Sequence, residues 1–357
     1  MGLSGGVDSA VAAAELQSAG WRVVGLFLRM AEASQPGGGC MSAGHAQDAA
    51  EVAERLGIEL VTRPAGDALA DVQEDFVRQY TAGRTPNPCI LCNARVKLAT
   101  LAAEADRLGL ARIATGHHAR IVAERSGRAR LARARGRQKD QSYALFAVPA
   151  GLRERLVLPL GELPGKEEVR RRARALDLPV HDKPDSQDIC FVPDDDYPAW
   201  LARRAPRALT PGPIVSVQGQ TLGRHEGYGR YTIGQRRGLG IAAAEPLYVT
   251  AIDPATATVT VGTRNQVQGR WLQAVGGVWH VQPPAGPFEA LVQIRYNHRG
   301  AAARVRPCPG GFQVRFHEPV HAITPGQAAV VYIEETVLGG GWIHSTGAHA
   351  PESDGAR

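Results

Sequence analysis

The sequence predicts an α/β fold in which a doubly wound parallel sheet is followed by two small β-rich domains. Two patterns support this. Up to about residue 205, short apolar runs alternate with helical patterns, as in doubly wound sheets. Beyond it, Gly and Pro punctuate short strand-like runs, as in small β domains. Because 357 residues are too many for one ordinary core, we expect domains at 1–205, 206–265 and 266–350, with a disordered tail at 351–357.

The elements of the first domain follow in order along the chain. We expect strands at 22–28, 58–63 and 111–116, one helix ending at Gly20, and further helices at 45–57, 68–83, 93–109 and 166–180. Later runs such as "PIVSV", "PLYVTAI", "ATVTVG", "EALVQIRY", "FQVRF" and "AAVVYI" are typical of short strands. Ligands of doubly wound sheets bind at the carboxyl ends of the strands, where the opening loop and "ATGHH" (114–118) would both lie.

The stretch "SGGVDS" (4–9) is a glycine loop that leads into a helix. Gly5 and Gly6 would let backbone N–H groups approach an anion closely, and Asp8 and Ser9 are residue types that cap helix N-termini. A glycine loop at a helix N-terminus is a site for phosphate. The loop matches neither the Walker A nor the G-x-G-x-x-G pattern. An ordinary glycine-rich turn before a surface helix is the alternative.

Composition excludes some classes of protein. No apolar run is long enough to cross a bilayer and no signal-peptide pattern opens the chain, so we expect a cytoplasmic protein with no membrane partner. The net charge of +6 permits an RNA partner without requiring one. Of the 41 basic residues only four are lysines, at positions 97, 139, 166 and 183. A site that needs a compact ammonium cannot exchange lysine for arginine, although four occurrences are also compatible with chance.

Five cysteines form no dense disulfide framework, and two of them lie in "GRTPNPCILCN" (83–93). Asn87 and Pro88 are an N-cap and first-turn pair, so a helix starts here, with Cys89 and Cys92 on one face of its first two turns. A helix N-terminus favours the thiolate over the thiol. The alternatives are a buried structural pair, or half of a zinc site, although no second C-x-x-C follows. Cys190, in "DKPDSQDICF" (182–191), is by itself typical of an ordinary half-buried cysteine.

Six stretches in this order carry a resemblance: "SGGVDS", "GRTPNP" with "ILCN", "ATGHHAR", "KDQSYAL", "DSQDICF" and "YTIGQRRGLG". Together they closely resemble the bacterial tRNA-specific 2-thiouridylases, the MnmA family, from residue 2 to about residue 345. The loop alone is shared with argininosuccinate, GMP and NAD synthetases and with other RNA thiolases, whereas the two cysteine motifs are more specific. The resemblance implies a PP-loop ATP pyrophosphatase domain with an adenine nucleotide alpha-hydrolase-like fold.

The resemblance also implies a reaction, the ATP-dependent 2-thiolation of the wobble uridine in the tRNA anticodon loop. The uridine C2 oxygen would be adenylated, with release of pyrophosphate and later AMP, and Asp8 would lie near Mg²⁺. Cys190 would carry sulfur as a persulfide received from a cysteine desulfurase or sulfur-relay protein, and Cys92 would attack it to release sulfide or to form a Cys92–Cys190 disulfide. The nucleotide would be held by Gly2, Leu3, Ser4, Gly5, Gly6, Val7, Asp8, Ser9, Leu28 and Gly116.

Recognition of tRNA would follow from the same resemblance. The target base would be flipped out of its stack, because chemistry on a stacked base is inaccessible, and Asn87, Pro88 and Cys89 would touch it. Further contacts would come from His117, Lys139, Asp140, Gln141, Arg295, Tyr296 and Gln327. Arg295 and Tyr296 pair a cation with a stacking ring, as in single-strand binding. From the residues alone, "IRY" is more typical of a strand with one exposed charge.

Two departures from the family pattern stand out. Only Met1 precedes Gly2, where the family has an apolar strand before the loop, so we expect a misplaced start, with a missing first strand as the alternative. Cys89 stands where many relatives carry aspartate, so Cys89, Cys92 and Cys190 are candidate ligands of an iron–sulfur cluster. The metal-free persulfide route is the alternative. Two other functions compete with thiolation: an amidotransferase-type synthetase, and an RNA-binding module with a decayed loop.

Overall fold

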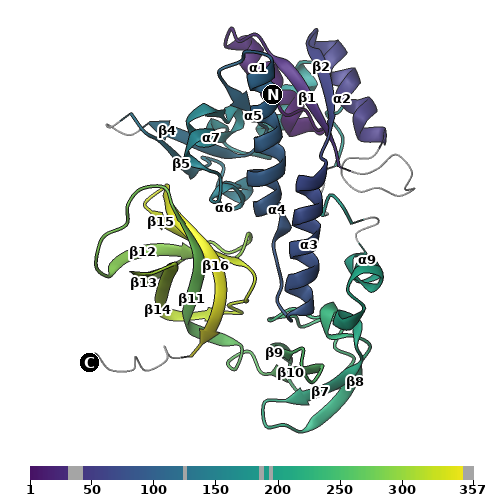
Figure 1. Cartoon of the computed structure of the whole chain (residues 1–357), viewed down its shortest axis with the longest axis vertical. Helices are drawn as coiled ribbons and strands as arrows, with labels where there is room; N and C mark the ends of the chain where they lie inside the picture. The colour runs from purple at the N-terminus through teal and green to yellow at the C-terminus, as the bar shows by residue number, and fades with distance from the viewer. Residues whose placement is uncertain (31–42, 124–126, 185–188, 193–195, 349–357) are drawn as a thin grey trace. The chain divides into compact units, whose positions relative to one another are not determined.

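The computed structural model describes residues 1–30, 43–123, 127–184, 189–192 and 196–348, and the chain divides into two compact units (Figure 1). Unit 1 comprises Met1–Gln73, Pro88–Asp196 and Glu335–Val337, and unit 2 comprises Glu74–Asn87, Tyr197–Glu334 and Leu338–Arg357. Each unit is built from segments that are far apart in the sequence. Among the helices described, none is long and apolar enough to cross a membrane. The tail expected at 351–357 lies outside the described residues.

Unit 1 contains the parallel sheet that the sequence predicts. Its strands pair in parallel as β1 (Val24–Arg29) with β2 (Glu59–Pro64), and β3 (Ile113–Ala114) with β6 (Leu156–Val157). Residues 1–3 join the two pairs, because Leu3 N–H donates to Leu26 O at 2.8 Å and Gly2 N–H donates to Ala114 O at 2.9 Å. The strand order is therefore β2, β1, residues 1–3, β3 and β6.

Helices cover both faces of this sheet (Figure 1). The helices that contribute to unit 1 are α1 (Val7–Ser18), α2 (Ala43–Leu56), α3 (Asp67–Thr81), α4 (Pro88–Leu91), α5 (Leu98–Arg107), α6 (Ser142–Leu145), α7 (Ala150–Arg155) and α8 (Lys166–Ala175). Phe27 packs with residues of α1, α2 and α8 in one apolar core. Its neighbour Leu26 lines a small cavity with Leu101 of α5. Successive strand residues point to opposite faces, so the sheet is doubly wound, as expected.

The remaining elements of unit 1 are short. They are a hairpin of β4 (Ala119–Ala123) and β5 (Ala129–Arg133), and the 3₁₀ turns η2 (Arg137–Lys139) and η3 (Pro159–Glu162). One further segment, η1 (Cys92–Lys97), is π-helical and lies between α4 and α5. The single helix expected at 93–109 is therefore two consecutive segments, η1 and α5. A π-helical turn is wider than an α-helical one and is frequent at functional sites.

Two details of the expected elements are wrong. Asp8 and Ser9 are not N-caps, because α1 begins at Val7 and Gly6 occupies the N-cap position. Ser9 lies inside the first turn, where its hydroxyl donates to Gly6 O at 2.9 Å. The helix expected at 166–180 ends at Ala175, because Asp177 takes a left-handed conformation with φ of 50°, as often follows a helix C-terminus.

Unit 2 is rich in β-structure, as predicted. A four-stranded sheet has the order β8 (Thr221–His225), β7 (Gly212–Ser216), β10 (Thr258–Gly262) and β9 (Tyr248–Asp253). A six-stranded barrel consists of β11 (Gln268–Trp279), β14 (Gly311–His321), β13 (Ala301–Cys308), β12 (Phe288–Gln293), β15 (Ala328–Ile333) and β16 (Thr336–Gly347). Pairing of β11 with β16 closes it, and the interior is apolar. Helical segments α9 (Tyr197–Arg204), η5 (Pro206–Leu209) and η6 (Tyr228–Arg230) precede the barrel.

Candidate active site

The glycine loop at residues 4–9 is packed so closely that two positions accept only glycine. Gly5 has φ of +73°, and a Cβ there would lie 2.4 Å from His45 O. A Cβ on Gly116 would lie 2.8 Å from the backbone of Asp8 and Ser9. The end of β3 therefore abuts the start of α1, which brings two predicted nucleotide-binding stretches together.

The loop leaves space beside the helix N-terminus. Among the described residues, only Ser4 Oγ, at 3.6 Å, lies within 4 Å of a Cβ built on Gly6. The first N–H groups of a helix have no intrahelical partner and attract anions. A phosphate group therefore fits next to Gly6 on both steric and electrostatic grounds. Three other predicted nucleotide contacts are less accessible. The N–H groups of Gly2 and Leu3 form hydrogen bonds within the sheet, and the Leu28 side chain is buried in β1.

Two lysines contact the loop. Lys166 Nζ, at the start of α8, donates to Asp8 Oδ1 at 2.6 Å, and His118 Nε2 lies 3.2 Å from the same oxygen. Lys183 Nζ donates to Gly5 O at 3.0 Å and also pairs with Asp48. Burial works to raise the pKa of Asp8, but the hydrogen bond with His118 and the charge of Lys166 outweigh it and lower that pKa. Asp8 is therefore a carboxylate held between two basic groups.

The thiols of Cys92 and Cys190 hydrogen-bond to each other, although the two residues come from distant segments. Both cysteines are free, and Cys92 is buried at the first position of η1. The hydrogen bond from Cys190 lowers the pKa of Cys92, and the charge of Lys97 at the other end of η1 acts in the same direction. The same hydrogen bond and burial raise the pKa of Cys190. Cys92 is therefore the thiol that ionises first.

Cys89 and Cys92 differ in exposure. The helix begins at Pro88, as predicted after Asn87, but Cys89 is exposed whereas Cys92 is 2% exposed. The charge of Cys89 nevertheless acts to raise the pKa of Cys92, so the two groups lie close enough to interact, and their shared face stays a prediction. Within the described ranges, no group of three Cys, His, Asp or Glu side chains is placed to hold a metal ion. The iron–sulfur cluster and the Mg²⁺ ion stay predictions from the resemblance.

The predicted tRNA contacts of unit 1 lie in two stretches that meet. Gln141 N–H donates to His118 O at 2.7 Å, and Gln141 Oε1 accepts from His118 N–H at 2.8 Å. His117 Nδ1 lies 2.7 Å from Thr115 Oγ1. Burial, helped by the charge of Lys97, lowers the pKa of His117 to about 3. His117 is therefore neutral at physiological pH.

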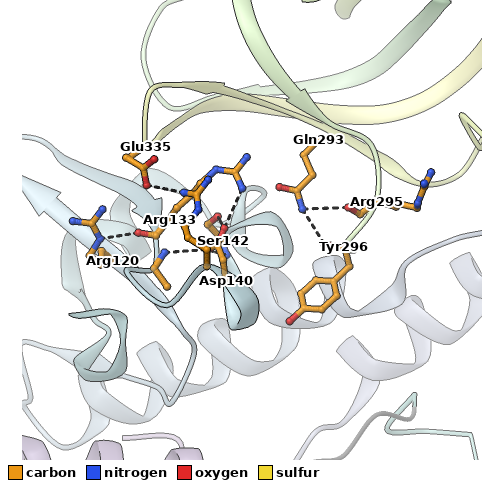
Figure 2. A network of polar contacts seen from close by, with 10 residues as sticks. Arg120, Arg133, Asp140, Ser142, Gln293, Arg295, Tyr296 and Glu335 are labelled. Atoms are coloured by element: carbon orange, nitrogen blue, oxygen red, sulfur yellow. Dashed lines mark hydrogen bonds and ion pairs between the residues drawn. The ribbon is translucent and has the colours of Figure 1, made fainter. Parts of the chain in front are cut away.

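Asp140 is held inside unit 1 by four interactions (Figure 2). Its carboxylate accepts from the N–H groups of Ala134 and Ser142 at 3.0 and 3.1 Å, and from Ser142 Oγ at 3.0 Å. Arg133 Nη1 lies 3.3 Å away, and the Arg133 and Asp140 side chains are 4% and 6% exposed. This carboxylate organises the segment from 133 to 142, so a direct contact with tRNA through it stays a prediction.

Unit 2 carries the other predicted tRNA contacts. Gln293 Nε2 donates to the carbonyl oxygens of Arg295 and Tyr296 at 3.2 and 3.0 Å, just beyond the end of β12 (Figure 2). The Tyr296 side chain is exposed, which suits stacking on a base. Gln327 Nε2 donates to Thr85 O at 2.8 Å, so residue 327 lies beside the segment that ends at Asn87.

Sequence reasoning gave no role to four side chains at these sites, which are His118, Arg133, Lys166 and Lys183. The scarcity of lysine in this arginine-rich chain is the one signal that singled out Lys166 and Lys183 in advance. The stretch "ATGHH" placed His118 near the loop without giving it a role, and no sequence pattern pointed to Arg133, because the partners of both lie in segments that only the fold brings near.

Comparison with known proteins decides the family. A family model described as the tRNA methyl transferase HUP domain matches residues 1–194, and models of a PRC-barrel domain and an aminomethyltransferase β-barrel domain match 199–263 and 271–343. The tRNA-specific 2-thiouridylase MnmA of Syntrophotalea carbinolica is 48% identical over 96% of this chain and 97% of its own. The chain belongs to the MnmA family. The family members of Pelobacter propionicus and Magnetococcus marinus are 44% and 42% identical over 96% of this chain, and over 96% and 97% of their own length.

Membership of the MnmA family confirms the resemblance carried by the six sequence motifs. It also agrees with the fold, in which a HUP-type α/β unit accompanies β-rich structure. The predicted limits at 205 and 265 stay predictions, as do the roles of the individual site residues.

Proposed function

We propose that this protein is a tRNA-uridine 2-sulfurtransferase that thiolates the wobble uridine of tRNA at the expense of ATP. One observation carries the proposal: the Cys92 and Cys190 thiols hydrogen-bond to each other in the unit that also holds the glycine loop. A synthetase that only adenylates a small molecule has no use for this pair. Relatives named tRNA-specific 2-thiouridylase, at 42 to 48% identity, support the same conclusion.

The glycine loop suits the ATP half of the reaction. The space beside Gly6 and the N–H groups that open α1 fit a phosphate chain. ATP would supply an adenylyl group to the uridine C2 oxygen, which turns a poor leaving group into a good one. Asp8 is ionised, and a carboxylate with phosphate oxygens is a suitable ligand set for Mg²⁺.

The thiol pair suits the sulfur half. Cys190 would receive sulfur as a persulfide from a cysteine desulfurase or a sulfur-relay protein. The Cys92 thiolate would then attack Sγ of Cys190, forming the Cys92–Cys190 disulfide and expelling hydrosulfide, which displaces AMP from C2. The lowered pKa of Cys92 suits the attacking thiolate. A cellular dithiol would restore both thiols for the next cycle.

The tRNA substrate would be held by the residues that the family resemblance assigns. Asn87, Pro88 and Cys89 would contact the flipped uridine, and the exposed ring of Tyr296 would stack on a neighbouring base. The neutral imidazole of His117 would act as a hydrogen-bonding group and not as a cation. With tRNA as its substrate, the protein would act in the cytoplasm.

Pyrophosphate release and nucleoside analysis together test the proposal. The protein is incubated with ATP, Mg²⁺, a cysteine desulfurase with cysteine as persulfide donor, a dithiol and an unmodified tRNA transcript, and 2-thiouridine is measured by mass spectrometry. We expect pyrophosphate release only with tRNA, and thiolated product. Release without tRNA would indicate a small-molecule synthetase, and no release with intact tRNA binding would indicate an RNA-binding module.

A further inference from the structure

Lys166 and Lys183 form the basic rim of the glycine loop, a name we use for these two side chains. Their ammonium groups contact Asp8 and Gly5 of the loop. The two side chains are 13% and 23% exposed, so both are partly withdrawn from water. In a chain with 41 basic residues and four lysines, two of the four lie at this one loop.

The chemistry of the rim matches a polyphosphate. Each ammonium is held by a carboxylate, Asp8 for Lys166 and Asp48 for Lys183, and carboxylate and phosphate oxygens are alike as partners of an ammonium. Lysine binds phosphate as a compact point charge, whereas the planar guanidinium of arginine needs more room. The loop beneath the rim already fits a phosphate group at Gly6.

We propose that Lys166 and Lys183 bind the β- and γ-phosphates of ATP and neutralise pyrophosphate as it leaves, exchanging Asp8 and Asp48 for phosphate oxygens. This assignment rests on the proposed function. When the uridine oxygen attacks the α-phosphorus, the bond to the α–β bridging oxygen breaks and its electron pair stays on pyrophosphate. Positioned cations stabilise that growing charge.

A purely structural role of the two lysines predicts a different pattern of nucleotide affinities. If the two lysines served only to join α8 and residue 183 to the loop, their loss would weaken every nucleotide equally. If they bind the outer phosphates, the loss falls on ligands that carry those phosphates. AMP, which lacks the β- and γ-phosphates, therefore separates the two roles.

The experiment measures dissociation constants of ATP, inorganic pyrophosphate and AMP by calorimetry for Lys166→Met, Lys183→Met and the wild type. We expect ATP and pyrophosphate to bind at least about tenfold more weakly in each variant, equivalent to about 1.4 kcal/mol, with AMP within about twofold. Arg171→Met is the matched control on α8, since Arg171 pairs with Glu168, and it should leave all three ligands unaffected. Asp48→Asn should keep or tighten ATP binding, because it frees Lys183.

Three results would overturn the assignment in different ways. Equal weakening of AMP and ATP would show that the lysines only support the fold, and melting temperatures of the variants would show the same loss. Unchanged ATP binding in both lysine variants would show that neither lysine belongs to the nucleotide site. Failure of the wild-type protein to bind ATP at all would refute the proposed function itself.

Discussion

Replacing Asp140 by Asn tests whether this predicted tRNA contact acts inside the protein. The carboxylate accepts three hydrogen bonds and faces Arg133, and both side chains are almost fully buried. Asn keeps the size but has one acceptor oxygen, and its NH₂ group faces N–H and O–H donors. The substitution therefore removes the negative charge that faces the buried guanidinium of Arg133.

The expected cost follows from this burial. Breaking a buried ion pair by removing one partner costs about 3–5 kcal/mol. In a unit of this size each kcal/mol lowers the melting temperature by about 2–4 °C, so we expect a fall of roughly 6–20 °C. An exposed pair is worth about 0–1 kcal/mol. Asp106→Asn is the matched control, because Asp106 pairs with Arg155 and is 67% exposed.

Urea unfolding followed by circular dichroism measures the stability, and filter binding at low temperature measures tRNA affinity. We expect Asp140→Asn to lower the free energy of unfolding by several kcal/mol more than Asp106→Asn does. The tRNA affinity of the folded fraction should stay within a few-fold of wild type. A variant with wild-type stability and at least tenfold weaker tRNA binding would refute this reasoning and assign Asp140 a direct contact.

Other predictions concern the thiols, the loop and the RNA. Cys92→Ser and Cys190→Ser should each abolish 2-thiouridine formation while tRNA affinity stays within a few-fold; wild-type turnover in either would disprove the two-thiol route. Lys97→Met should move the midpoint of the pH profile for Cys92 alkylation upward, because the lysine charge lowers that pKa; peptide mass spectrometry reports the rate, and an unmoved midpoint contradicts the prediction. Gly116→Ala should weaken ATP binding at least about tenfold, since its Cβ would overlap the backbone of the loop; calorimetry with full affinity would contradict it. Affinity for tRNA should fall steeply between about 50 and 200 mM salt as counterions are released, and a flat plot would exclude phosphate contacts.

Local patterns predicted the elements that build the sheet. Apolar periodicity located β1, α2, β2 and α3 to within about two residues at each end. This works because the side of a helix or strand that is buried against the sheet is set by the spacing of apolar residues within that element. The widening at η1 was missed, since the sequence "CNARVK" has an ordinary helical composition. The N-cap at Gly6 was missed because Asp8 and Ser9 are better capping types, and loop geometry overrides that preference.

No local sequence pattern could predict the long-range contacts in the site. The pairing of Cys92 with Cys190 was expected only from the family resemblance, because nothing in either motif specifies the other as its partner. The burial of Asp140 depends on Arg133 and on backbone N–H groups that fold around it. A sequence read residue by residue gives the chemical type of such a group, whereas its surroundings come from the fold.

The short segment Glu335–Val337 belongs to unit 1 although it lies near the end of the chain. Glu335 O accepts from Arg133 N–H at 2.8 Å, its carboxylate pairs with Arg137, and Thr336 pairs with Ala132 of β5. Domains generally fold as they leave the ribosome, N-terminal first. Here the β4–β5 hairpin gains its partners in this segment only once residue 337 has been synthesised. Unit 1, whose N-terminal part is made first, is therefore completed only near the end of synthesis.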